Sequence, residues 1–228
     1  MPVKGVITLE NNFTLIDMDT WARAQTYQYY AEYVTPTSYS VSLDLDVTIL
    51  KQQLKKKEIK FFPTCLYLIS KTITAFIEFR MAVKDTGIGY FDCLHPQYSV
   101  FHEDNKTFSF LWTEYKENFK EFNKGYLDDI EKYGHEHNFI TSKGNPPDNS
   151  YIISCSPWLN FNSCSIHMQN IEGYLAPMFI LGGFKYEGEN IKMPISITIN
   201  HAAADGYHIK LFIDELQKLM NHPEEWLI

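Results

Sequence analysis

The feature that most constrains the fold of this chain is a change in apolar spacing between residues 195 and 220. Ile195, Ile197 and Ile199 alternate with polar residues, which predicts a strand with one buried face. Beyond this strand, apolar residues recur every three or four positions, which predicts an amphipathic helix. The helix residues are Ile209, Phe212, Ile213, Leu216 and Met220. The short connection between strand and helix is the kind of place where a rigid scaffold presents reactive groups.

Similar patterns elsewhere predict strands and helices in comparable amounts, without a regular alternation of the two. Further helices are predicted at residues 19–33, 48–59, 64–80 and 118–137. Strands are predicted at residues 38–50, 88–115 (two or three strands), 151–163 and 176–200 (two strands joined around Gly188). The mixture predicts an α/β fold, a two-layer sandwich in which helices cover a large mixed sheet.

Composition and charge narrow the class of protein. The 228 residues are 45% hydrophobic and contain no Gly/Ser/Pro-rich linker, so we expect one domain over residues 1–228. The formal net charge of −8 argues against a nucleic-acid partner, whose groove would need clustered Lys and Arg. The densest basic run, LKKKEIK at residues 54–60, lies in a helical pattern and is interpreted as a solvated helix face.

No apolar run has the length of a signal peptide or a membrane span, so we expect a cytoplasmic protein without a membrane partner. The cysteines lack the close spacing of metal sites. We therefore expect no metal, and reduced packing thiols at Cys65, Cys93, Cys155 and Cys164.

His201 lies where the predicted strand meets the helix, with Asp205 and Gly206 close behind it. Neutral imidazole is well suited to accept a proton near pH 7, so His201 is a candidate general base. The alternative is a core histidine whose ring is hydrogen-bonded to backbone groups. The His-x-x-x-Asp spacing by itself leaves both interpretations open.

The segment NHAAADGYHIKLF, residues 200–212, resembles the active-site signature of the chloramphenicol acetyltransferase family, His-His-x-x-x-Asp-Gly followed by a helix. Five more blocks are similar to that family in the same order along the chain, and three of them contain short motifs. They are Trp-x-Arg at residues 21–23, Phe-Arg-Met-Ala at residues 79–82 and Ile-Ser-x-x-Pro-Trp-x-x-Phe at residues 153–161. The resemblance covers nearly the full length.

The resemblance implies a homotrimer with the fold of CoA-dependent acyltransferases and an active site in each cleft between two subunits. It implies that His201 deprotonates an acceptor hydroxyl, which attacks acetyl-CoA, the co-substrate, without a covalent acyl-enzyme. Ser154 would donate a hydrogen bond to the tetrahedral oxyanion.

Two interpretations of Asp205 differ in their consequences. Its spacing from His201 suggests a dyad in which the carboxylate orients the base. The resemblance implies instead a buried ion pair with Arg23 that shapes the site. Gly206 is interpreted as a backbone requirement at the start of the helix.

The sequence also departs from the family it resembles. Asn200 replaces the first histidine of the signature, and Ile180 stands where a threonine would help to hold a water at the oxyanion. Isoleucine donates no hydrogen bond, so more of the stabilisation would rest on Ser154. The resemblance also implies an acceptor pocket, in which several residues, Cys164 among them, differ from those usual in the family. The pocket residues are Tyr30, Thr37, Tyr39, Phe110, Phe139, Ile166 and Met168.

Three functional hypotheses follow. The first is an O-acetyltransferase that uses acetyl-CoA and chloramphenicol. The second keeps this chemistry with another hydroxyl or amine compound as acceptor, because the pocket residues are larger and more polar than usual. The third is a non-catalytic trimeric binder of small molecules, for which Ile180 is the main support.

Overall fold

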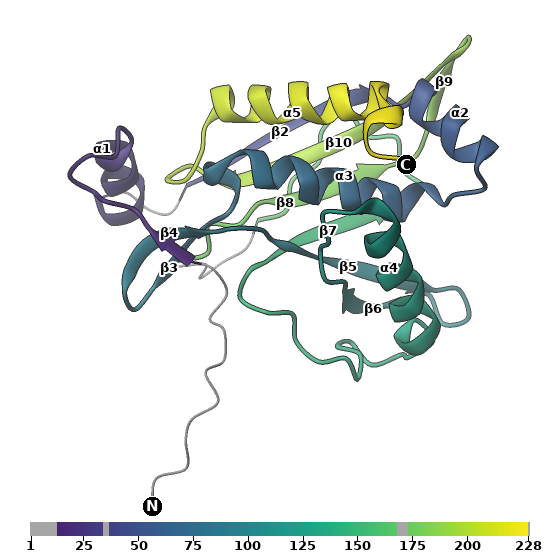
Figure 1. Cartoon of the computed structure of the whole chain (residues 1–228), viewed down its shortest axis with the longest axis horizontal. Coiled ribbons are helices and arrows are strands. Elements are labelled where there is room, and N and C mark those ends of the chain that lie inside the picture. Colours follow the sequence, from purple (N-terminus) through teal and green to yellow (C-terminus); the bar gives the residue numbers. More distant parts are fainter. Residues whose placement is uncertain (1–12, 34–36, 168–172, 228) are drawn as a thin grey trace, which may run out of the picture.

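The computed structural model describes residues 13–33, 37–167 and 173–227 (Figure 1). Its large sheet has the strand order β2–β10–β8–β7–β5–β6, and β9 pairs with β10. The β5–β7 and β7–β8 pairs are parallel and the others are antiparallel, which confirms a mixed sheet. The strands are β2 (Ser38–Asp46), β5 (His95–His102), β6 (Thr107–Trp112), β7 (Ser150–Ser156), β8 (Met178–Gly182), β9 (Lys185–Glu187) and β10 (Asn190–Asn200).

Helices α3 (Phe61–Ala75), α4 (Phe119–Tyr133) and α5 (Gly206–Asn221) lie side by side on one face of this sheet (Figure 1). Helix α2 (Thr48–Lys56) follows β2 and contacts α5. This arrangement of helices over a mixed sheet confirms the predicted α/β sandwich. At one end lie α1 (Ala24–Gln28), which continues as a π-helix, and a small sheet of β1 (Phe13–Leu15), β4 (Gly87–Phe91) and β3 (Met81–Lys84).

The core lies between the sheet and the helices. The three alternating isoleucines of β10, Ile195, Ile197 and Ile199, are buried on this side, as their spacing predicts. Phe212 of α5 stacks on Phe79 and on Phe179, with ring centroids 4.6 and 5.4 Å apart. A fully buried side chain of this size contributes about 1.5–3 kcal/mol, so these contacts fix α5 on the sheet.

The predicted helix at residues 64–80 was wrong at both ends. Helix α3 begins at Phe61, because Pro63 lies in the first turn, where the missing N–H needs no intrahelical acceptor. The helix ends at Ala75, and a short 3-10 turn leads into β3 at Met81. Burial on nearly every side of α3 removes the amphipathic signal that would mark its end in the sequence.

Other predicted boundaries also shifted. The region 176–200 contains three strands, because β9 forms a short hairpin with the start of β10. The strand predicted at residues 151–163 ends at Ser156, and the helix predicted at residues 19–33 contains only α1 and a π-helical turn, Tyr29–Tyr33. Short segments of this kind depend on tertiary contacts more than on local pattern.

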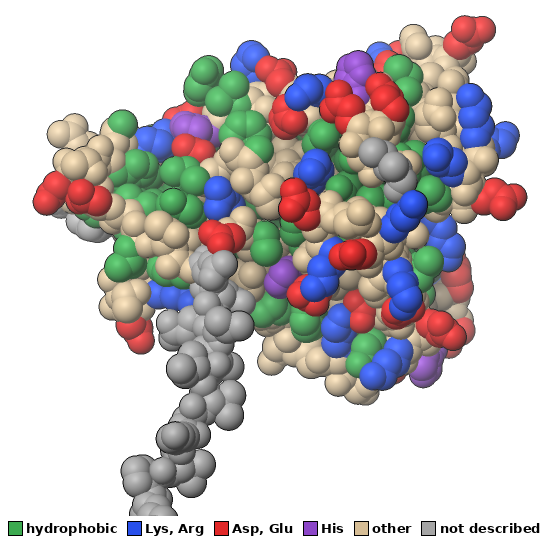
Figure 2. All heavy atoms as spheres, viewed as in Figure 1, with side chains coloured by type: hydrophobic (Ala, Val, Ile, Leu, Met, Phe, Trp, Pro, Cys, Tyr) green, Lys and Arg blue, Asp and Glu red, His purple; other side chains and the backbone are tan. Residues whose placement is uncertain are grey.

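Acidic and basic side chains are interspersed over the helix-covered face (Figure 2). Lys55 and Lys56 are exposed in the last turn of α2, so the basic run there is a solvated helix face, as predicted. All four cysteines are free thiols, and burial raises the pKa of Cys155 to about 11. In the described part of the chain, every helix is too short or too polar to cross a membrane.

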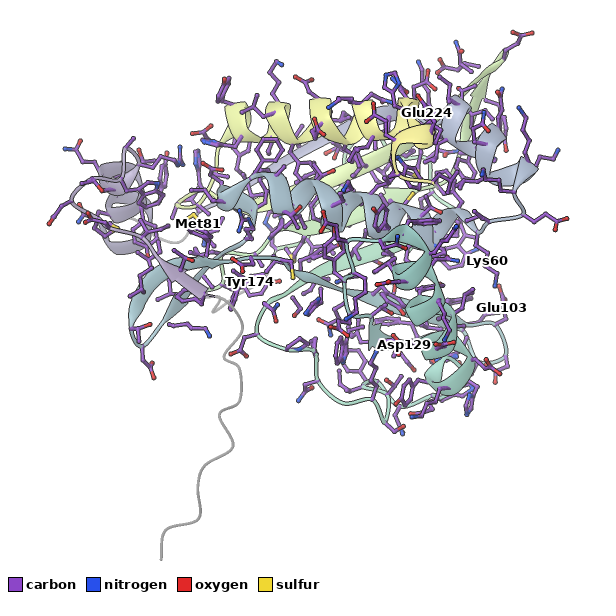
Figure 3. All side chains as sticks on the ribbon, viewed as in Figure 1. Lys60, Met81, Glu103, Asp129, Tyr174 and Glu224 are labelled. Atoms are coloured by element: carbon purple, nitrogen blue, oxygen red, sulfur yellow. The ribbon has the colours of Figure 1, made fainter. Side chains whose placement is uncertain are left out.

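Asp129 of α4 holds the loop that follows this helix (Figure 3). Its carboxylate binds the Lys143 ammonium at 2.5 Å and accepts a hydrogen bond from Thr113 at 2.8 Å. The Lys143 ammonium also donates to the carbonyl of Trp112 and lies over its ring. Both members of the ion pair are largely buried, at 15% and 14% exposed, so the pair ties the loop to β6.

We expect Asp129→Ala to lower the free energy of unfolding by about 3 kcal/mol, because the buried Lys143 ammonium loses its carboxylate. Urea unfolding measures this change. The matched control is Asp128→Ala on the same helix, which breaks an exposed pair with Lys124 and should cost less than about 1 kcal/mol. Equal losses for the two variants would show that the Asp129 pair does not hold the loop.

Candidate active site

The imidazole of His201 packs on two tyrosine rings at the end of β10. The π-helical turn places Tyr30 flat against it, with ring centroids 4.3 Å apart and an angle of 8° between the planes. Tyr39 of β2 lies 5.3 Å away at 58°. The backbone N–H of His201 donates to the carbonyl of Thr37 at 2.8 Å. The structure therefore brings Tyr30, Thr37, Tyr39 and His201 together.

The Nδ1 atom of His201 is buried and has no hydrogen-bond partner among the described residues. A core histidine satisfied by backbone groups would place a carbonyl or N–H here. Instead, packing against the tyrosine rings sets the orientation of the imidazole. An aromatic face also favours a cation beside it, which is the state that a general base reaches after it takes a proton.

Asp205 is the N-cap of α5, and the contacts described for its side chain do not include His201. Its Oδ2 binds Arg23 at 2.6 Å, while its Oδ1 accepts from the Tyr207 N–H at 3.0 Å and contacts His208 Nδ1 at 2.9 Å. Burial raises the pKa of Asp205, but the hydrogen bonds from Arg23 and His208 outweigh it and lower this pKa to about 2. The carboxylate therefore stays ionised and secures the start of the helix.

Gly206 leaves room for a neighbouring side chain and does not have the left-handed backbone that only glycine adopts readily. It is absent from the residues with left-handed φ, so the expectation of a special backbone there was wrong. A Cβ at this position would lie 2.9 Å from the Tyr39 hydroxyl oxygen. The glycine therefore lets the Tyr39 ring lie beside His201 at the start of α5.

Ser154 lies in a row of side chains that crosses the sheet on the face away from the helices. Ser154 pairs in register with Ile180, which pairs with Ser196, and the Ser154 hydroxyl lies 3.1 Å from that of Ser99. We call these residues the cross-sheet row, one from each strand of the main path. They are Ser42, Ser196, Ile180, Ser154, Ser99 and Phe110.

The segment after β7 crosses this face above the first two members of the row. The carbonyl of Cys164 accepts a hydrogen bond from Ser196 at 2.5 Å, and its N–H donates to Ser42 at 3.1 Å. Ile166, farther along the segment, is 41% exposed. Met168, a predicted acceptor contact, lies outside the described residues.

Phe110 and Phe139 meet at the other edge of the sheet. Their ring centroids are 5.1 Å apart, and the Phe110 N–H donates to the Phe139 carbonyl at 2.7 Å. Phe139 is 60% exposed, although it belongs to the loop that the Asp129–Lys143 pair secures. The structure thus presents an aromatic surface at β6.

The candidate residues form two clusters that lie far apart within one chain. Asn200, next to His201, is four residues along β10 from Ser196, or about 13 Å at the rise of a strand. Ser154 lies two strands across the sheet from Ser196, about 10 Å away in the perpendicular direction. The histidine cluster is Arg23, Tyr30, Thr37, Tyr39, His201 and Asp205; the serine cluster is Ser99, Ser154, Ile180, Phe110 and Phe139.

Three residues near the two clusters, Ser99, Glu78 and His208, are not predicted from the sequence. His208 bridges Asp205 and Glu78, whose Oε1 lies 3.6 Å from His208 Nε2. Its position three residues after the N-cap is a signal that the sequence contains, since N3 side chains return to the cap. Ser99 has no local signal, because its contact with Ser154 depends on the register of β5 and β7.

The chain is similar to known proteins over most of its length. The family model described as chloramphenicol acetyltransferase matches residues 11–217. The chain is 40% identical to a chloramphenicol acetyltransferase from Clostridium butyricum over 95% of this chain and 98% of the relative. It is 34% identical to one from Staphylococcus aureus, over 95% of this chain and the whole of the relative.

A solved structure of a chloramphenicol acetyltransferase superposes with a TM-score of 0.80 at 20% identity, covering 91% of this chain and 99% of that one. This likeness shows that the fold is shared. The match of the family model over most of the chain, together with these relatives, shows more than the fold. The chain belongs to the chloramphenicol acetyltransferase family and is therefore an acyltransferase.

Proposed function

We propose that this protein transfers the acetyl group of acetyl-CoA to a hydroxyl of chloramphenicol. The observation that carries the proposal is His201, an imidazole packed on Tyr30 and Tyr39 with an Nδ1 atom that no described residue binds. The names of the relatives support both the acetyl transfer and the acceptor. We assign the activity to one domain over residues 1–228 that acts in the cytoplasm.

His201 is the proposed general base. Its imidazole takes the proton of the acceptor hydroxyl as the oxygen attacks the thioester carbonyl carbon. The C–S bond of the tetrahedral intermediate then breaks, and the imidazolium returns the proton to the CoA thiolate. The tyrosine rings stabilise the imidazolium and restrict the imidazole to one orientation, which reduces the entropy lost on the way to the transition state.

Ser154 is the proposed oxyanion donor. A neutral thioester carbonyl fits a surface with a hydroxyl donor beside an apolar side chain, and Ser154 lies in register with Ile180. Ile180 supplies no hydrogen bond, so Ser154 has to supply a larger share of the oxyanion stabilisation than it would beside a second donor. One such donor is worth about 2.7–4 kcal/mol of barrier.

We further propose that His201 of one subunit acts with Ser154 of another in a homotrimer. The separation of the two clusters within one chain supports this, because a base and an oxyanion donor must lie within reach of the same reacting carbonyl. The aromatic surface of Phe110 and Phe139 belongs to the serine cluster. The neighbouring subunit would complete the acceptor pocket with Tyr30, Thr37 and Tyr39.

The central test is release of free CoA thiol from acetyl-CoA, with and without chloramphenicol. We expect chloramphenicol-dependent release in the wild type and its loss, by at least about 10³-fold in kcat, in His201→Ala, because the proton then has no acceptor. Release of CoA thiol with other alcohols or amines, and none with chloramphenicol, would show that the acceptor is a different compound and that the acetyl transfer is as proposed. Chloramphenicol binding without release, measured by calorimetry, would favour a non-catalytic binder.

A mixture of two inactive variants tests the shared site. His201→Ala and Ser154→Ala chains, co-expressed in equal amounts, should form mixed trimers in which about one quarter of the interfaces pair an intact His201 with an intact Ser154. We expect activity to recover to about that fraction, measured as CoA release per subunit. Activity no higher than that of the separate variants would place both residues in one subunit's site.

The Arg23–Asp205 ion pair should stabilise the fold more than it assists proton transfer. We expect Asp205→Asn to lower the free energy of unfolding at pH 7 by about 1–3 kcal/mol, since the Asp205 side chain is 32% exposed and the pair is partly screened. A folded variant that kept its Tm and lost all turnover would instead support a role for Asp205 in catalysis.

The stabilisation by Asp205 should also depend on pH in a defined direction. Its pKa is about 2 in the folded protein, below that of the unfolded chain, so its contribution is complete above the unfolded pKa and is lost as pH falls through about 2. Urea unfolding should therefore show a smaller difference between wild type and Asp205→Asn at pH 3.5 than at pH 7. A difference independent of pH would contradict the low pKa.

A further inference from the structure

Ser99, on β5, is the one member of the cross-sheet row whose hydroxyl contacts that of Ser154, at 3.1 Å. We propose that Ser99 is a positioning residue that donates a hydrogen bond to Ser154 and so directs the Ser154 proton toward the oxyanion. This inference rests on the proposed function of Ser154. It adds a residue that acts through another and does not itself touch the reacting atoms.

The neighbours of Ser154 explain why its hydroxyl needs such a partner. On one side, β8 presents Ile180 in register, and its side chain neither donates nor accepts. On the other side, β5 presents Ser99. A serine side chain has three staggered χ1 positions, so without a partner to hold its oxygen it spends only part of its time aimed at the substrate.

The direction of the hydrogen bond decides what Ser154 can do. If Ser154 donated to Ser99, its one proton would be unavailable to the substrate. If Ser99 donates, a lone pair of the Ser154 oxygen is occupied and the Ser154 proton is left for the oxyanion. Negative charge on the substrate favours the second arrangement, and the two bonds in series polarise and strengthen each other.

Two other hydroxyls of the row hold a backbone segment in place, which the Ser99 hydroxyl does not do. Ser42 and Ser196 both bind the backbone of Cys164 and hold the segment that crosses the sheet. In the described part of the chain, Ser154 is the partner recorded for the Ser99 hydroxyl. Removal of the Ser99 hydroxyl therefore frees no loop and breaks no backbone contact that the structure describes.

Kinetics of four variants test the inference. We expect Ser99→Ala to lower kcat about 3- to 10-fold with KM for both substrates and Tm nearly unchanged, because it removes one neutral hydrogen bond from the transition state. Ser99→Thr keeps a hydroxyl and should restore kcat. Ser154→Ala should lose about 10²- to 10³-fold, and adding Ser99→Ala to it should cost nothing more.

Ser40→Ala is the matched control. It also removes one hydroxyl from a pair on neighbouring strands of the same sheet, Ser40 and Thr198 at 2.9 Å, and should leave kcat within about two-fold of wild type. An unchanged kcat in Ser99→Ala would overturn the inference. A further loss of kcat on adding Ser99→Ala to Ser154→Ala would overturn it too, since Ser99 would then act independently.

A crystal structure of Ser99→Ala gives a readout that does not require turnover. We expect the Ser154 side chain to occupy more than one rotamer in the variant and a single rotamer in the wild type. A single unchanged rotamer would overturn the inference. If the wild type released no CoA with chloramphenicol, the proposed acceptor would be wrong, and this rotamer comparison would still decide the role of Ser99.

Discussion

The pairing of β10 with β2 is the interaction on which the rest of the molecule depends. The pairing runs along the whole of β2, Ser38–Asp46, and fixes the register of β10. The two faces of β10 have different roles. One face carries the isoleucines that pack under α5, and the other carries Ser196 in the cross-sheet row. A shift by one residue would exchange the faces, so the core and the candidate site are specified by the same register.

The same strand delivers His201 to its surroundings. Residues just beyond the strand lead into the N-cap Asp205, and the Arg23 ion pair ties that cap to the α1 region, from which Tyr30 reaches the imidazole. An imidazole held by ring stacking, with the Asp205 carboxylate paired to Arg23, differs from a His–Asp dyad. The carboxylate sets the geometry of the turn, and the tyrosine rings set the orientation of the imidazole.

The serine cluster has a different physical basis. Ser154 and Ile180 belong to parallel strands in the middle of the sheet, where flanking strands fix the backbone on both sides. The proposed role of Ser154 as an oxyanion donor would gain from this rigidity, because such a donor must be aimed before the charge appears. The isoleucine removes a possible second donor, and the Ser99–Ser154 contact is a side-chain hydrogen bond between neighbouring strands at this point. Phe139, by contrast, sits on a loop secured by a largely buried ion pair.

The sequence by itself determined the α/β class, the buried faces of β10 and α5, and the strand-to-helix connection with His201, because these depend on local periodicity. It did not determine the ends of α3, which is buried on nearly every side, or the short strands β1, β3 and β9, which exist through their partners. Only the tertiary structure decided that Asp205 faces Arg23, that Gly206 makes room for Tyr39, and that Ser99 meets Ser154. These contacts join residues distant in the chain, and strand register and helix packing, which no local pattern encodes, bring them together.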